Sequence, residues 1–356
     1  MGARAGRASI VLVALAACAR PARTDEGSLA ATESTGYSST TTTATAATPP
    51  MPGAPPAASP SVTAPAPASC VHDGTPYDPA VMRERVTRLA APGLDGRVPG
   101  RHGDGRARAF IAEQFACLGL VPAGIDGGYE QPFTDEGDAT ANVLGYVQGT
   151  DPGGDIIVIG AHHDHLGGGL LGANDNASGV VAMLAIAQAV QQRATPPRRT
   201  ILFAAFGAEE RGMRGSAHFV ANDPEALPLA RVVQVINLDM VGSHSSRGFV
   251  AAMGTFRGLP ATGVLAKLDD RYPRLNVGLG GVARGSDHEP FCKRGIPYVF
   301  FWTPDRRCYH RACDTAERLD YPRMVDIAAL AGDLAEALAD SDADLAAARE
   351  RRGCGL

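Results

Sequence analysis

Strand and helix signals alternate along most of this chain, and this alternation constrains the fold more than any other feature. Continuous apolar runs typical of buried strands are separated by stretches whose apolar residues recur at helical spacing. The expected strands are Asn142–Val147, Asp155–Gly160, Thr200–Phe206, Val232–Leu238 and Ile296–Trp302, and the expected helices are Pro79–Leu89, Gly105–Leu118, Ser178–Gln192 and Pro322–Ala339. The pattern predicts an α/β fold, a three-layer sandwich whose mixed, largely parallel central sheet is flanked by helices.

The composition is compatible with one large folded domain and argues against nucleic acid as a partner. Of the 356 residues, 45% are apolar, which is enough for the core of one large α/β domain. The formal net charge is -5 and the sequence has no long basic run. We therefore expect no nucleic-acid binding.

The first residues have the pattern of an export signal. Arg4 and Arg7 precede the apolar stretch Ile10–Leu15, as in the charged and apolar regions of a signal peptide. The stretch ends in Leu15-Ala16-Ala17-Cys18, which resembles a bacterial lipobox; ordinary cleavage beside a chance Cys is the alternative. We expect a signal peptide over residues 1–17 and a lipid on Cys18 that holds the mature protein at the membrane. The protein would then be exported to the cell envelope, on the outer-membrane or periplasmic side, with release from the cell as the alternative.

The rest of the chain divides by composition. Residues 18–70 are dominated by Ala, Thr, Ser and Pro, and such a segment buries too little apolar surface to offset its ordering entropy. We expect it to be a flexible stalk. The composition becomes globular from residue 71, so the predicted domain covers residues 71–342 and a tail covers 343–356.

Six cysteines remain beside Cys18. An even number in an exported protein suggests disulfide bonds. Only Cys308 and Cys313, which are close in the sequence, are expected to pair. The pairing of the other four stays open: Cys70, Cys117, Cys292 and Cys354.

Polar residues follow one expected strand after another. These stretches are His162-His163-Asp164-His165, Glu209-Glu210, Asp239 and Cys308-Tyr309-His310, and Asn174-Asp175-Asn176 precedes a helix. Ligands of open α/β sheets bind beyond the carboxyl ends of the strands, so we expect these groups to converge. Imidazole and carboxylate together suit zinc. A ligand set of two His and three carboxylates drawn from these stretches exceeds the needs of one catalytic zinc. Such a set favours two ions that share a bridging carboxylate.

The same stretches resemble a known family. They are Gly160-Ala161-His162-His163-Asp164, Asn174-Asp175-Asn176-Ala177-Ser178-Gly179, Phe206-Gly207-Ala208-Glu209-Glu210, Asn237-Leu238-Asp239-Met240, Ser286-Asp287-His288 and Tyr309-His310-Arg311-Ala312-Cys313-Asp314-Thr315. In order and spacing they resemble the secreted bacterial di-zinc aminopeptidases, relatives of glutamate carboxypeptidase and glutaminyl cyclase, over roughly residues 80–340. The resemblance implies the fold of zinc-dependent exopeptidases.

The resemblance also implies two zinc ions per chain and a role for each ligand. His162 and Asp239 would hold one zinc, Glu210 and His310 would hold the other, and Asp175 would bridge both. By the same resemblance His163 and His165 are not expected to be ligands, because the His-x-Asp pattern favours His162.

Three further residues are expected to act in catalysis. Glu209 would be the general base and Asp164 would orient His162. Tyr309 would donate to a developing oxyanion. His288 is expected to be structural, and contact of Asp287 or Arg284 with substrate stays open.

The predicted function is hydrolysis of a peptide bond at a free N-terminus, with a water activated by two metal ions. Peptide or protein N-termini would be the substrate, and we expect a monomer. Two alternatives stay open: cyclisation of an N-terminal Gln, as in the related glutaminyl cyclases, and a surface lipoprotein whose domain binds peptides without turnover.

Overall fold

The computed structural model describes residues 74–151 and 153–351. The predicted signal peptide, Cys18 and the predicted stalk lie outside the described residues. Within the part that is described, no helix combines the length and the apolar character that a membrane crossing requires.

A mixed nine-stranded sheet forms the centre of the described domain, with the strand order β1-β3-β5-β4-β6-β9-β7-β8 and β2 paired to β3. The strands are β1 Val121–Pro122, β2 Glu130–Asp135, β3 Asp138–Val147, β4 Ile156–His162, β5 Thr200–Phe206, β6 Val232–Leu238, β7 Phe249–Met253, β8 Asn276–Leu279 and β9 Tyr298–Trp302. The neighbours β5, β4, β6 and β9 run parallel to one another, whereas β3 and β7 pair antiparallel with this central group. This confirms the predicted mixed, largely parallel sheet.

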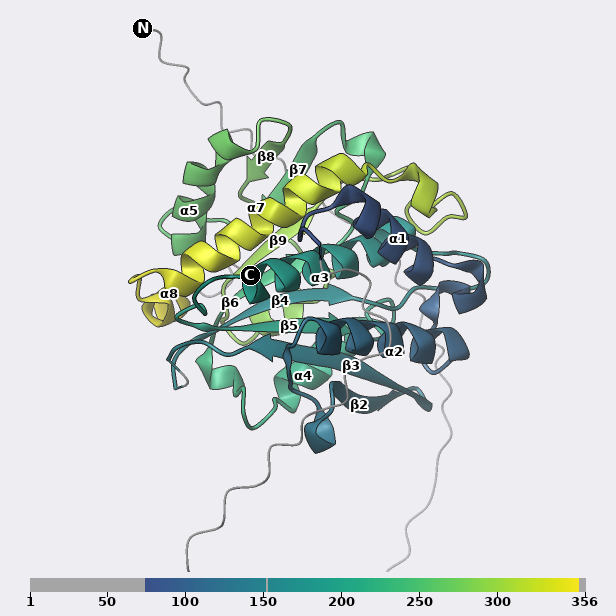
Figure 1. The fold of residues 1–356 in the computed structure, drawn as a ribbon, viewed down its shortest axis with the longest axis horizontal. Coiled ribbons are helices and arrows are strands. Elements are labelled where there is room, and N and C mark those ends of the chain that lie inside the picture. The colour runs from purple at the N-terminus through teal and green to yellow at the C-terminus, as the bar shows by residue number, and fades with distance from the viewer. Residues whose placement is uncertain (1–73, 152, 352–356) are drawn as a thin grey trace, which may run out of the picture. The chain divides into compact units, whose positions relative to one another are not determined.

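Helices cover both faces of the sheet. Neighbouring residues of each central strand point to opposite sides, and apolar residues lie on both sides. In β4, Ile157 joins one apolar cluster and Val158 joins the other. The first cluster includes residues of α1 Pro79–Leu89, α2 His102–Cys117, α3 Ser178–Gln191, α5 Pro260–Leu268 and α7 Tyr321–Asp340, of which α3 and α7 cross the near face of the sheet in Figure 1. The second includes residues of the shorter helices α4 Arg214–Ala221 and α6 His288–Cys292. The three-layer sandwich is thus confirmed.

Strand register aligns the ends that carry the candidate site residues. His162 at the end of β4 lies opposite Phe206 at the end of β5. Gly160 lies opposite Asn237 of β6, and Leu238 lies opposite Phe301 of β9. The loops that follow these four parallel strands therefore begin at one edge of the sheet.

The C-terminal segment differs from the predicted tail. Within residues 343–351 the structure forms a further helix, α8 Leu345–Arg351. Leu345 and Ala348 are buried, and Leu345 belongs to the first apolar cluster. This helix packs against β6, so the folded domain extends beyond the predicted boundary at residue 342.

Candidate metal centre

All five predicted metal ligands lie at the aligned edge of the sheet. His162 ends β4, Glu210 follows β5, and Asp239 follows β6 directly. Asp175 belongs to the turn Ala173–Ala177 before α3, and His310 belongs to the loop after β9. His310 has a positive φ of 54°, which turns the backbone sharply within that loop.

One group of possible ligands consists of His162, Asp175 and Asp239, all buried. Nε2 of His162 lies 3.3 Å from Oδ1 of Asp175 and 3.4 Å from Oδ1 of Asp239. The other carboxylate oxygen of Asp239 accepts a hydrogen bond of 2.7 Å from Ser286 Oγ. Asp239 is therefore held with one oxygen directed to the group.

A second group consists of Asp175, Glu210, His310 and His165. Nε2 of His310 lies 3.1 Å from both Asp175 Oδ2 and Glu210 Oε2. Nδ1 of His165 lies 2.7 Å from Glu210 Oε1. The structure thus adds His165, which the sequence analysis excluded as a ligand, to the cluster.

Asp175 joins the two groups, because its Oδ1 faces His162 and its Oδ2 faces His310. Its backbone is fixed by Asp314, whose buried carboxylate accepts hydrogen bonds from the N–H groups of Asn174 and Asp175 at 2.7 and 3.0 Å. Asp314 and His310 lie on the same loop, so this contact ties the turn of Asp175 to the loop of His310.

Several buried atoms of the cluster have no hydrogen-bond partner within residues 74–151 and 153–351, and they provide a test of whether these residues fit a metal. They are Nε2 of His162, Nε2 of His165, Oδ2 of Asp175 and Oδ1 of Asp239. Nε2 of His162 and Oδ1 of Asp239 lie 3.4 Å apart, within ion-pair distance but not in hydrogen-bonding geometry. Since an unpaired buried polar group is costly, converging lone pairs of this kind fit divalent cations, and imidazole with carboxylate is a donor set that zinc accepts.

Electrostatics agrees with this fit. Burial opposes protonation of His162, but Asp239 and Glu209 raise its pKa well above the usual range. Burial likewise opposes protonation of His310, yet contacts with Asp175 and Glu210 raise its pKa to about 10. Although burial alone would raise the pKa of Asp175, contacts with His162 and His310 hold it well below the usual range. A cluster that attracts protons so strongly also attracts metal cations, because both are held by the same negative charge.

Asp164 contacts both His162 and the turn that carries Glu209. Its carboxylate accepts the backbone N–H groups of Glu209 and Glu210 at 2.9 and 3.3 Å. The carboxylate is 3.8 Å from Nδ1 of His162, whereas the backbone carbonyl oxygen of Asp164 is only 3.2 Å away. Donation from Nδ1 to that carbonyl leaves Nε2 with a free lone pair, as a metal ligand requires. Asp164 thus positions both His162 and the turn that carries Glu209.

Glu209, the predicted general base, lies beside the first group. Its Oε2 is 4.0 Å from Nε2 of His162, and its side chain is 11% exposed. From the protein groups alone, burial raises the pKa of Glu209 well above the usual range; His162 opposes the shift, and Asp287 and Asp239 add to it. A bound cation would favour the ionised form.

Tyr309 lies at the surface of the centre. Its ring stacks on that of His310, with 3.8 Å between centroids and an interplanar angle of 26°, and it is 46% exposed. Burial of part of the side chain, together with the site carboxylates Asp175 and Glu210, raises its pKa above the usual range. The hydroxyl is therefore a hydrogen-bond donor at neutral pH.

The predicted disulfide between Cys308 and Cys313 is present and closes the loop that carries His310. Cys117 and Cys292 also take part in disulfide bonds. The Cys308–Cys313 disulfide reduces the conformational freedom of the loop that carries His310.

Arg97 is a residue near the centre that sequence reasoning missed. Its guanidinium is buried and donates to four backbone carbonyls, those of His163, Leu89, Leu171 and Gly172, at 2.6 to 2.9 Å. Burial lowers its pKa to about 10, and nearby carboxylates led by Asp164 oppose that shift. The side chain is therefore charged at neutral pH and links the loop after β4 to the turn before α3.

The other histidines of the motifs have structural contacts. Nε2 of His163 lies 3.1 Å from Oδ1 of Asp104 on α2. His288 stacks on Phe300, with 4.8 Å between ring centroids, and Nε2 is 3.1 Å from the carbonyl of Ala283. Neither belongs to a metal-binding group among the described residues, which agrees with the sequence analysis.

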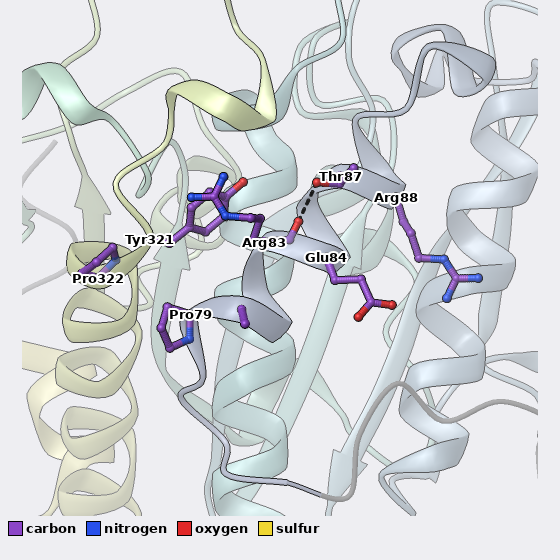
Figure 2. Close-up of a pocket in the computed structure, with 8 residues that line it drawn as sticks. Pro79, Arg83, Glu84, Thr87, Arg88, Tyr321 and Pro322 are labelled. Atoms are coloured by element: carbon purple, nitrogen blue, oxygen red, sulfur yellow. Dashed lines mark hydrogen bonds between the residues drawn. The ribbon is translucent and has the colours of Figure 1, made fainter.

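A surface groove between α1 and α7 is separate from this chemistry. Figure 2 shows its lining, which includes Arg83 and Tyr321. The guanidinium of Arg83 lies over the Tyr321 ring, 4.3 Å from its centroid. None of the five predicted metal ligands lines this groove.

The architecture and the cluster define a class, the α/β proteins with a candidate metal centre at the carboxyl edge of a largely parallel sheet. The sequence matches Peptidase family M28 over residues 142–335, which is more than half of the chain. The chain therefore belongs to peptidase family M28, as its motifs predicted.

Curated relatives are longer proteins. Leupeptin-inactivating enzyme 1 of Streptomyces exfoliatus is 28% identical over 286 residues, which cover 74% of this chain and 61% of that protein. Aminopeptidase YwaD of Bacillus subtilis is 33% identical over 193 residues, which cover 51% of this chain and 40% of that protein. The chain thus spans less than two thirds of the length of these relatives.

Solved structures share the fold. LapA aminopeptidase of Legionella pneumophila aligns with a TM-score of 0.63 and 24% identity, over 74% of this chain and 73% of that chain. BSAP, a zinc aminopeptidase from Bacillus subtilis, aligns with a TM-score of 0.63 and 17% identity, over 76% and 98%. Glutaminyl cyclase of Porphyromonas gingivalis aligns with a TM-score of 0.60 and 16% identity, over 74% and 100%. At these identities the similarity establishes the fold alone.

Proposed function

We propose that this protein is a zinc-dependent aminopeptidase that uses two metal ions per chain to release residues from peptide N-termini. The observation that carries the proposal is the arrangement of Asp175, whose two carboxylate oxygens face His162 on one side and His310 on the other. Membership in a peptidase family and the aminopeptidases among its relatives support the choice of reaction.

The ligands divide between two metal positions. His162 and Asp239 would hold one zinc, Glu210 and His310 would hold the other, and Asp175 would contribute one oxygen to each. When bound, such ions supply Lewis acidity to the scissile carbonyl and to the attacking water. The unpaired buried atoms of His162, Asp175 and Asp239 support this assignment.

The remaining steps belong to the protein. Glu209 accepts a proton from the attacking water and delivers it to the leaving amine. Its position is fixed because the carboxylate of Asp164 accepts the backbone N–H groups of Glu209 and Glu210. The Tyr309 hydroxyl donates a hydrogen bond to the oxyanion that develops at the scissile carbonyl.

Incubation of the purified protein with a mixed peptide library tests the proposal. We expect products shortened from the N-terminus, detected by mass spectrometry, and loss of this activity with a chelator. Restoration by added zinc, but not by added magnesium, would support zinc as the metal. Products shortened from the C-terminus would contradict the proposal, as would activity that survives complete metal removal.

The same assay distinguishes the alternatives kept open by the sequence. A glutaminyl cyclase would release ammonia and leave the peptide length unchanged. A peptide-binding lipoprotein would retain peptides without turnover at saturating zinc.

Export and membrane attachment are a separate proposal. The lipobox-like sequence ending at Cys18 supports a lipid anchor on the bacterial cell envelope. Cys18→Ser should shift the protein from the membrane fraction to the soluble fraction of its host.

A further inference from the structure

His165 is the member of the metal-binding cluster to which neither the proposed mechanism nor the predicted ligand set gives a role. Its side chain is completely buried, and Nδ1 lies 2.7 Å from Glu210 Oε1. Since a carboxylate oxygen can only accept at neutral pH, Nδ1–H is the donor. The contact occupies one oxygen of Glu210 and leaves Oε2 to face His310, 3.1 Å from Nε2.

The surroundings of His165 hold the ring in this place. A Cβ atom on Gly172 would come within 2.5 Å of the ring Cγ of His165, so the chain can approach only because residue 172 has no side chain. On another side the ring meets His310 edge-on, with 5.6 Å between centroids and an angle of 69°. The imidazole is therefore wedged between the loop before Asp175 and the two ligands of the second metal position.

Stability alone does not account for a histidine here. Nε2 of His165 is buried and has no hydrogen-bond partner among the described residues. A buried polar atom without a partner destabilises the fold, and an apolar side chain of similar size would avoid this cost. Among the described residues, the hydrogen bond that the ring does make is the one with Glu210, which points to a role at the metal.

We infer that His165 is a positioning residue that fixes the Glu210 carboxylate and thereby sets the zinc affinity of the position formed by Glu210, His310 and Asp175. Without this donor, Glu210 can rotate and present either oxygen, so ordering it on metal binding becomes more costly. The other position, formed by His162, Asp239 and Asp175, lacks an equivalent contact with His165. This inference rests on the proposed two-metal site.

Zinc titration of the metal-free protein against a chromophoric chelator tests the inference without measuring activity. For the unmodified chain we expect two equivalents of zinc and two binding constants. His165→Ala should weaken one constant by about 10–100-fold, as loss of a partner that orients a ligand generally does. The other constant should change by less than about threefold.

Two further variants separate positioning from other roles. In His165→Asn the amide nitrogen can occupy the place of Nδ1 and donate to Glu210, so the lost affinity should return to within about threefold of the unmodified protein. His163→Ala removes a buried imidazole of the same segment that contacts Asp104 instead. It should lower the melting temperature but leave both zinc constants unchanged.

Each result decides between explanations. Unchanged constants in His165→Ala would overturn the inference. His165→Asn as weak as His165→Ala would overturn the donor role, since direct ligation by the ring would then explain the loss. Fewer than two zinc equivalents in the unmodified protein would instead refute the proposed two-metal function.

Discussion

Glu209→Gln is expected to lower kcat for peptide hydrolysis by about 10²–10⁴-fold, the usual contribution of a general base. Gln keeps the size of the side chain but cannot accept the proton from water. Glu209 belongs to neither group of possible ligands among the described residues, so zinc content should not change. The measurements are steady-state kinetics on an N-terminally free peptide and zinc content by mass spectrometry.

A surface substitution provides the control for this loss. Glu113 lies on α2 and is exposed, so Glu113→Gln should leave kcat and zinc content unchanged. If Glu209→Gln retained full activity, Glu209 would not be the base. If the variant lost zinc together with activity, the loss could be assigned to a damaged metal centre, and the base assignment would fail its test.

Arg97→Met is expected to produce the largest loss of stability. The substitution keeps most of the side-chain volume but leaves the carbonyls of His163, Leu89, Leu171 and Gly172 without their buried donor. Each buried acceptor left without its donor costs about 1–3 kcal/mol, and the substitution affects four of them. For a domain of this size the melting temperature should fall by roughly 10 °C, measured by thermal unfolding of the purified protein.

Arg106 on the same part of the chain offers a matched control. It is exposed on α2, so Arg106→Met should change the free energy of unfolding by less than about 0.5 kcal/mol. Equal melting temperatures for Arg97→Met and the unmodified protein would show that the buried guanidinium is not the link between the two ligand loops.

The central strands could be predicted because they are buried on both faces, and strands of this kind have continuous apolar sequences. Every residue of β5 Thr200–Phe206 and β6 Val232–Leu238 is buried, and both strands have the predicted bounds. By contrast, β8 Asn276–Leu279 has only half-buried or exposed residues, and α6 His288–Cys292 has a single turn and a half. Such elements depend on distant pairing partners, which leave no local pattern.

The candidate site likewise contains residues whose position could be predicted from the sequence and residues whose role could not. His162, Glu210 and Asp239 follow buried strands, so topology alone brought them to one edge of the sheet. The role of Arg97 could not be predicted from the sequence, because its partners are backbone carbonyls, which every residue has. The contact of His165 with Glu210 could not be predicted, because it depends on how the loop after β4 folds back past Gly172.

The most direct test of the metal centre is anomalous X-ray scattering from crystals grown with zinc and measured on both sides of the zinc absorption edge. Two peaks are predicted, one contacting His162 and Asp239, the other contacting Glu210 and His310, with Asp175 between them. A single peak, or peaks away from these five side chains, would contradict a two-zinc centre.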